Sequence, residues 1–246
     1  MKKKGYHALR FCICFSTIFF ISCGTHHNTD EIKLTGTLIN ATGKKIMLSE
    51  LLPAGTVMLD SSVLSSEGAF AFRFKPDSAG FYLLRIPGNR KILLVSERGE
   101  MISITADLNI NPFTYSIVGS PGSSLLRDFL FYSEKNLAKA DSLTGILRQN
   151  QDNPEFYGMT RDFDPLFKNI IDDQKKFERR FILANKYSMA SLIVLNYKLG
   201  LKPVLTLESE PELFLMLDST LSSRYPQNKH VLFHHQRVME FKRESQ

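Results

Sequence analysis

The chain has 246 residues, 19 Phe, no Trp and a formal net charge of +6. Four of its 31 basic residues fall within the first ten positions, which leaves 27 basic against 25 acidic residues in the rest of the chain. No long basic run follows residue 23. Nucleic-acid binding requires a clustered basic face, so the composition argues against nucleic acid as a partner.

The first 22 residues have the pattern of an export signal. A basic start (Lys2 to Lys4 and Arg10) precedes a largely apolar stretch over residues 11–21, which is shorter than the roughly 20 residues that a membrane-spanning helix needs. A basic start, a short apolar segment and small residues at its end are typical of a cleaved signal peptide. Because Cys23 follows Ser22, the end resembles a lipobox, with Phe20 where that pattern usually has Leu.

We therefore expect a lipoprotein signal peptide over residues 1–22 and lipid attachment at Cys23. The mature protein would be anchored to a membrane of the cell envelope, with the outer membrane favoured. The sequence does not distinguish the periplasmic side of that membrane from the surface side. A secreted protein with a chance cysteine is the alternative.

The cysteines limit the chemistry of the mature chain. Cys12 and Cys14 lie inside the predicted signal and Cys23 would carry the lipid, so no free thiol and no disulfide would remain. This arrangement excludes thiol catalysis, dithiol redox chemistry and cysteine metal sites.

After a short polar tether over residues 23–31, the sequence alternates with period two up to residue 119. Residues 69–75 place Phe70, Phe72 and Phe74 on one face of a strand. Turn signals rich in Gly, Pro, Ser and Asp recur every 8–12 residues or so, which is typical of short antiparallel strands in a sandwich. We expect about eight strands, which begin near residues 32, 45, 56, 69, 80, 91, 101 and 113.

Residues 120–246 change to a helical period, so the expected fold class is α+β, with an antiparallel β-sandwich domain over residues 32–119 and an all-helical domain after it. Apolar residues at helical spacing predict a helix after residue 122 and a long one over 156–181, with Pro165 as a candidate bend. They also predict a shorter helix over 191–199 that is closed by Gly200. A capping box over residues 209–212 opens the next helix, and the last runs over 229–243.

Catalytic motifs are not found in this sequence. It contains no glycine-rich phosphate loop, no nucleophile elbow and no Cys-x-x-Cys. His230 and His234 are four residues apart on the last predicted helix and could together hold a zinc ion. The favoured interpretation is instead a solvated polar face, so we expect no metal and no cofactor. The acidic residues 172–173 and 208–212 are interpreted as charged outer faces of helices.

The order of these features resembles the N-terminal region of lipoprotein thiol-disulfide interchange proteins of the thioredoxin-like, thiol-peroxidase-related kind. The resemblance spans roughly residues 1–245. It depends mainly on the order and spacing of four short segments, which are residues 34–38, 59–63, 68–72 and 117–120. In that family a lipobox is followed by a β-sandwich domain of unknown function, a helical segment and a thioredoxin fold.

The sequence departs from this family where its redox chemistry would begin. The thioredoxin domain with its Cys-x-x-Cys is expected about where the sequence stops, so no redox residue of the family has a counterpart among these 246 residues. The resemblance thus implies either a stand-alone version of the accessory region or a gene that has lost its catalytic half.

These observations favour a non-enzymatic envelope lipoprotein that acts as an accessory or protein-binding module. Two alternatives stay open: binding of a small ligand, such as a glycan or peptide, between the two halves, and an enzyme with an unrecognised site.

The last predicted helix is the candidate interaction surface. It carries a row of apolar residues near the position where the family's next domain would lie, so we expect self-association or a separate protein partner there, with Leu232 and Phe241 near the centre. The alternative is that this helix packs only on its neighbours.

Changing Cys23 to Ala is expected to abolish labelling of the protein by a fatty-acid probe and to prevent its maturation, because the thiol is the acceptor of the lipid. Each acyl chain contributes about 0.8 kcal/mol per buried CH₂ to membrane attachment. The measurement is metabolic labelling together with membrane fractionation. A variant that still takes up lipid and fractionates like the parent would contradict the lipobox.

Overall fold

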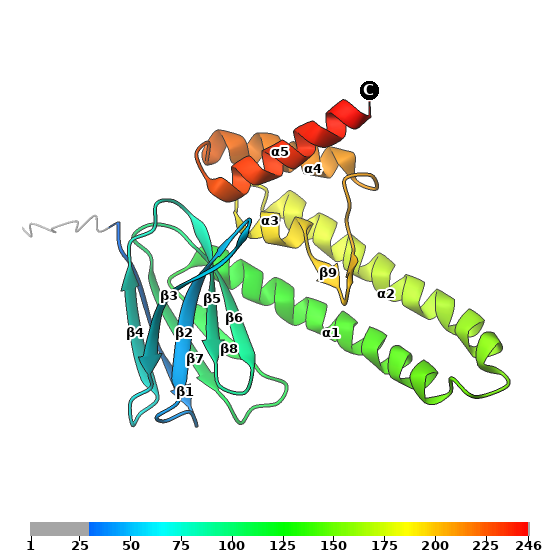
Figure 1. Ribbon diagram of the computed structural model, residues 1–246, viewed down its shortest axis with the longest axis horizontal. Helices are drawn as coiled ribbons and strands as arrows, with labels where there is room; N and C mark the ends of the chain where they lie inside the picture. The colour runs from blue at the N-terminus through cyan, green and yellow to red at the C-terminus, as the bar shows by residue number, and fades with distance from the viewer. Residues whose placement is uncertain (1–29, 246) are drawn as a thin grey trace, which may run out of the picture.

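The computed structural model describes residues 30–245, which form an α+β structure with a two-sheet half and a helical half (Figure 1). The predicted signal peptide, Cys23 and most of the tether lie outside the described residues. The last two tether residues, Asp30 and Glu31, form ion pairs with Lys75 and Arg73 beside the sheets. None of the helices within residues 30–245 combines the length and apolar character needed to cross a membrane.

Eight strands make up the two-sheet half, and they begin at or within two residues of the predicted positions. They form two four-stranded sheets, in the orders β4-β1-β7-β8 and β3-β2-β5-β6. The strands are β1 (Ile32–Ile39), β2 (Lys45–Leu52), β3 (Gly55–Val63), β4 (Ala69–Phe74), β5 (Gly80–Ile86), β6 (Arg90–Ser96), β7 (Met101–Asp107) and β8 (Tyr115–Val118).

One apolar core lies between the two sheets. The alternation predicted from sequence places Phe70 and Phe72 of β4 in this core, together with Leu34 of β1, Leu84 of β5 and Ile104 of β7. Both sheets contribute buried side chains to it, as expected for two sheets that pack face to face.

Two expectations about the strands were wrong. The sheets are not wholly antiparallel, because β1 pairs with β7 in parallel, with Leu34 opposite Ile102. The segment after residue 119 is not all-helical either. It contains a short hairpin of β9 (Lys198–Leu199) and β10 (Lys202–Pro203), with Gly200 at a positive φ of 65° between them. Gly200 therefore turns a hairpin and does not close a helix.

The helical half consists of five helices besides this hairpin within the described residues. These are α1 (Pro121–Gln149), α2 (Phe156–Ala184), α3 (Ala190–Leu195), α4 (Pro211–Arg224) and α5 (Lys229–Glu244). Helices α1 and α2 form a long hairpin that projects away from the sheets, while α4 and α5 lie above α3 (Figure 1). Helix α2 continues through Pro165, and α3 ends four residues earlier than expected.

The predicted capping box at the start of α4 was also wrong. The N-cap residue is Glu210, whose side chain makes no capping hydrogen bond. Ser209 instead bonds with Thr206 within the preceding loop. Glu210 forms ion pairs with Lys175 and Arg179 of α2, so the carboxylate joins two helices in place of capping one.

The two halves are joined where α1 begins against the edge strand β6. The hydroxyl groups of Ser120 and Ser123 both donate to the backbone carbonyl of Val95, at 2.9 and 2.8 Å, and the Val95 N–H donates to Ser123 Oγ at 3.0 Å. Both serines are buried. A second apolar core then connects Val95 and Phe81 of the sheet to Leu126, Phe129 and residues of α3 to α5.

Replacing Gly36 with Ala is expected to lower the free energy of unfolding by about 1–3 kcal/mol, the usual effect of an overpacked core. An added Cβ would lie 2.2 Å from the backbone oxygen of Ile104 and 2.7 Å from the Phe70 ring. Gly55→Ala is the matched control, because no atom lies within 4 Å of the position that a Cβ would take there. Chemical denaturation of both variants is the measurement, and equal stability of the two would contradict the packing of β1.

Candidate binding cleft

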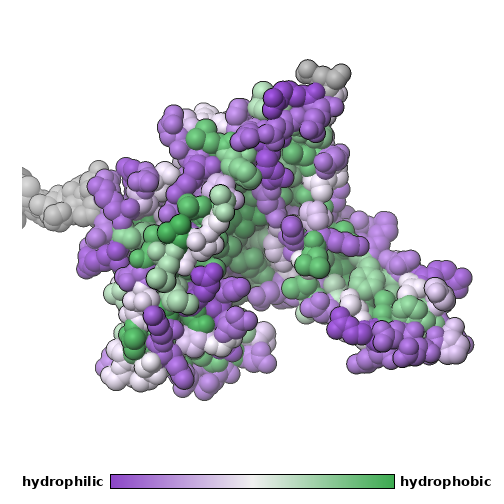
Figure 2. All heavy atoms as spheres, in the orientation of Figure 1, coloured by the Kyte–Doolittle hydropathy of each residue, from purple (hydrophilic) through white to green (hydrophobic). Residues whose placement is uncertain are grey.

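A cleft of about 380 Å³ lies between the two-sheet half and helices α3 and α5. Figure 2 shows apolar residues gathered in the hollow between the two halves on this face of the molecule. The two-sheet half lines the cleft with Leu51, Pro53, Phe81 and Leu93, α3 and its C-cap with Leu192, Ile193 and Asn196, and α5 with His230, Phe233, His234 and Arg237. An apolar cleft of this size with a few polar groups is the usual form of a ligand site.

The start of α5 is fixed to the sheets by Asn228, which sets the position of the cleft. Its side-chain oxygen accepts from the backbone N–H groups of His230 and Val231 as an N-cap. Its side-chain nitrogen donates to the backbone oxygen of Ala79 at 2.5 Å and to Ser78 Oγ at 2.9 Å. The neighbouring Lys229 forms an ion pair with Glu50 at 2.6 Å.

His230 and His234 both line the cleft and are buried, with 8% and 2% of their surface exposed. The favoured expectation of a solvated polar face was therefore wrong for these two residues. The His230 ring packs on Phe81, with 4.4 Å between ring centroids. Within residues 30–245 no group of three or more His, Cys, Asp or Glu could hold a metal ion, so the pair has no third ligand of these types.

Burial lowers the pKa of both histidines. For His230, the charge of Lys229 adds to this effect, whereas the Leu51 backbone and the charge of Glu50 oppose it. For His234, the positive charges of Arg237 and His235 act in the same direction, whereas the Phe214 carbonyl and Asp218 oppose it. Both imidazoles are thus neutral at pH 7, because the charged form is disfavoured in an apolar wall.

The hydrogen bonds of His234 determine its tautomer. Its Nε2 lies 3.3 Å from the backbone oxygen of Phe214, and since a carbonyl only accepts, Nε2 carries the proton. Its Nδ1 is then an acceptor, and this atom is buried with no hydrogen-bond partner. His230 Nε2 is likewise buried and unpartnered. Unpaired polar atoms in a protein interior cost about 1–3 kcal/mol each and therefore require an explanation.

The two residues predicted at an interaction surface of α5 differ in exposure. Leu232 is 49% exposed, and its neighbour Phe233 is 47% exposed. Phe241 is partly buried and packs on the second core, while Val231 and Val238 are fully within it. The exposed apolar surface of α5 therefore centres on residues 232, 233 and 239 rather than on Phe241.

A second notable group is the buried carboxyl of Glu178, between α1 and α2. Gln174 donates to Glu178 Oε1 at 3.0 Å and to Ser133 Oγ at 2.9 Å, and it accepts from Asn136 at 3.1 Å. The other oxygen, Oε2, is buried without a partner. Burial raises the pKa of Glu178 to about 8, while the bond from Gln174 acts in the opposite direction.

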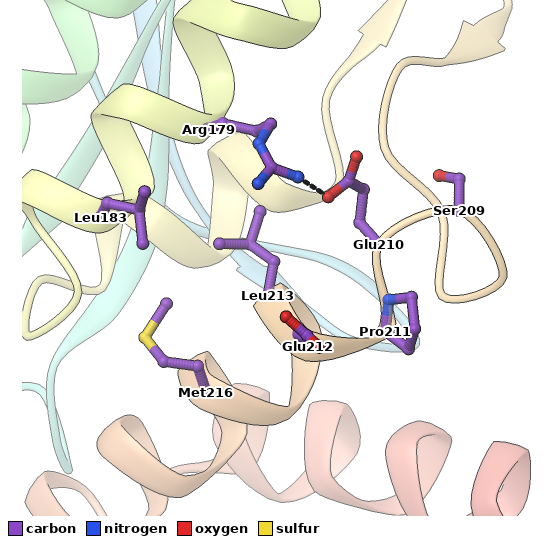
Figure 3. Close-up of a pocket in the computed structure, with 8 residues that line it drawn as sticks. All are labelled: Arg179, Leu183, Ser209, Glu210, Pro211, Glu212, Leu213 and Met216. Carbon is purple, nitrogen blue, oxygen red and sulfur yellow. Dashed lines mark hydrogen bonds and ion pairs between the residues drawn. The ribbon is translucent and has the colours of Figure 1, made fainter.

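Two further hollows contain charged residues that are already paired. Figure 3 shows the hollow of about 450 Å³ at the start of α4, where Arg179 reaches Glu210 beside Leu183, Leu213 and Met216. Another, of about 390 Å³, lies between the sheets and the α1–α2 hairpin and includes two carboxylates. There the Tyr225 hydroxyl donates to Glu97 at 2.6 Å, and Ser96 donates to Glu100 at 2.7 Å.

Comparison with known proteins adds no relative: no protein-family model matches the chain, and no curated protein matches its sequence. Functional inference therefore depends on the geometry of the cleft and of the helices. Sequence reasoning identified the histidine pair and kept a ligand site between the two halves as an alternative, but it did not place the pair in that site, because the pair faces residues 81 and 93, far away in the chain. The available signal was Asn228, a good N-cap residue directly before the helix.

Replacing Glu178 with Gln is expected to stabilise the protein increasingly as pH rises. A carboxyl with a pKa of about 8 when folded and 4.5 as its ordinary value binds its proton more tightly in the folded state. The stability of the parent therefore falls as pH rises from about 4.5 to about 8 and then levels off. The Gln side chain keeps the bond to Gln174 without a charge, so we expect a gain on the order of 1–3 kcal/mol at pH 8.

Chemical denaturation of the parent and this variant at pH 5, 6.5 and 8 tests the effect. Asp141→Asn removes an exposed carboxylate from α1 and serves as the control. A difference between the Glu178→Gln variant and the parent that stays constant with pH would show that Glu178 is not a buried acid.

Proposed function

We propose that the chain is a lipid-anchored, non-enzymatic protein of the cell envelope whose β-sandwich and helical segment bind a partner protein. Cys23 would hold it at the membrane, most simply the outer membrane, as an accessory module related to those of thiol-disulfide interchange lipoproteins. The observation that carries the partner-binding role is the far half of the α1–α2 hairpin.

This far half, residues 137–173, is here called the distal arm. None of its side chains is fully buried, whereas both helices contain buried residues closer to the sheets, from Ser123 to Asn136 in α1 and from Gln174 to Ile182 in α2. The distal arm extends beyond the other elements (Figure 1). Two helices alone cover each other on one side only, so their remaining apolar side chains face water.

An open groove of about 640 Å³ lies along this part of the hairpin. Small residues on α1, Ala138 and Ser142, lie beside Leu143 and, on α2, Leu166 and Ile170. Leu166 is 45% exposed. Exposed apolar surface of this kind usually marks an interaction site, and helices commonly gain stability by packing such a face against another element.

The arrangement of titratable groups supports a non-enzymatic role. Glu178 has the most strongly raised carboxyl pKa among the described residues, but its side chain is fully buried between the helices, where no substrate reaches it. The two buried histidines contact apolar residues. Neither lies within hydrogen-bonding distance of a serine that it could activate as a base or of a carboxylate that could orient it.

A photo-cross-linking amino acid at Ala138 of the full-length protein is expected to capture one defined partner protein in intact envelopes. The same group at Thr105, exposed on the two-sheet half, should capture none. In the Ala138-labelled protein, Leu166→Asp should abolish the cross-link because it places a charge in the groove.

The matched control is Ile171→Asp, because Ile171 is 41% exposed but does not line the groove. This change should leave the cross-link intact. Equal loss in both variants, or an equal cross-link from position 105, would refute binding through the distal arm.

A further inference from the structure

The cleft beside α5 combines apolar walls from three separate parts of the chain. Phe81 and Leu93 come from neighbouring strands, Leu192 from α3 and Phe233 from α5. Phe233 is 47% exposed at this surface. The volume of about 380 Å³ lies within the usual range for small-ligand sites and is large enough for an apolar amino-acid side chain with its backbone.

Arg237 supplies a positive charge to this cleft. Its guanidinium donates to Asn196 Oδ1 at 2.8 Å, which fixes its position next to the apolar walls. Among the described residues it forms no ion pair within 4.0 Å, whereas Lys229 at the start of the same helix is paired with Glu50. A guanidinium beside an apolar surface is suited to bind a carboxylate through paired hydrogen bonds.

His234 adds an acceptor that needs a donor, and His230 adds a second unpartnered ring nitrogen. His234 Nδ1 has no partner, and it is an acceptor because Nε2 carries the proton. His230 Nε2 is also unpartnered. Both atoms are closed to solvent although their side chains line the cleft, so a ligand donor bonds His234 Nδ1 once it displaces a neighbouring apolar group. A peptide N–H is such a donor, whereas a fatty acid offers a carboxylate and no N–H.

We propose that this cleft binds the C-terminal end of a peptide whose last residue is apolar. Its carboxylate pairs with Arg237, its side chain enters between Phe81, Leu93 and Phe233, and its N–H approaches the histidine pair. This site is separate from the distal arm, so it goes beyond the proposed partner binding and does not depend on it.

The test uses the full-length lipoprotein in phospholipid nanodiscs and a fluorescein-labelled hexapeptide that ends in Ala-Leu with a free carboxylate. Fluorescence anisotropy should show saturable binding over that of empty nanodiscs. Amidation of the C-terminus should weaken binding about tenfold or more, since a charge-assisted bond is lost. Methylation of the last amide nitrogen should also weaken it, because the N–H is removed.

Variants of α5 separate the cleft from the rest of the helix. Arg237→Gln should abolish the difference between the acid and the amide, while Arg243→Gln, an exposed residue of the last turn, should keep it. Phe233→Asp should weaken binding of both peptides. Leu232→Asp is the control, because Leu232 is equally exposed at 49% but does not line the cleft.

Absence of binding, equal binding of acid and amide, or equal effects of the two Asp variants would overturn the proposal. Competition with decanoate tests whether the cleft instead binds a fatty acid, which also combines an apolar chain with a carboxylate. If decanoate displaces the peptide fully and N-methylation has no effect, the cleft is a fatty-acid site and the peptide assignment is wrong. Melting curves of each variant confirm that the fold is retained.

Discussion

The contact between Val95 and the two serines at the start of α1 is the constraint on which the arrangement of the two halves depends. Strand β6 is the edge of its sheet, and an open edge leaves backbone N–H and C=O groups unpaired. Here both backbone groups of Val95 are bonded to hydroxyls of Ser120 and Ser123. The approach is close, because a Cβ on Gly122 would lie 3.1 Å from the Val95 oxygen. Small side chains at the helix start therefore allow the helix to cover the sheet edge.

The direction of α1 follows from this contact and decides which surfaces are buried. Near the sheets, Leu126 and Phe129 enter a core shared with α2 to α5, and the Phe129 ring stacks on Phe177 with 5.5 Å between centroids. Farther from the sheets, no other described element covers the α1–α2 hairpin, so the side chains of the distal arm stay at least partly exposed. The start of α5 is attached to the sheets through Asn228, Lys229 and the packing of His230 on Phe81, and its residues from His230 to Arg237 form one wall of the cleft.

Local patterns predicted the positions of the elements well but not their partners. The eight strands of the two-sheet half and the last helix were placed correctly because alternation, stripes and turn residues act over a few positions. The parallel pairing of β1 with β7 was missed, since nothing in either strand encodes which distant strand it joins. The capping box failed because Ser209 bonds with Thr206 in the preceding loop, and the N-cap position falls on Glu210 instead. The histidines were expected to face water because the sequence of their own helix does not show that Phe81, which is distant in the chain, packs against it.

The sequence by itself determined the change from period two to a helical period near residue 119 and the apolar faces of each element, and it predicts lipid attachment at Cys23. Only the tertiary structure decided which of those faces is covered. It buried His230, His234 and Glu178, left the distal arm exposed, and placed Arg237 beside an apolar cleft with no ion pair to another described residue within 4.0 Å. The physical reason is that periodicity records whether a side chain avoids water, whereas burial and pKa depend on groups brought together from distant positions in the chain.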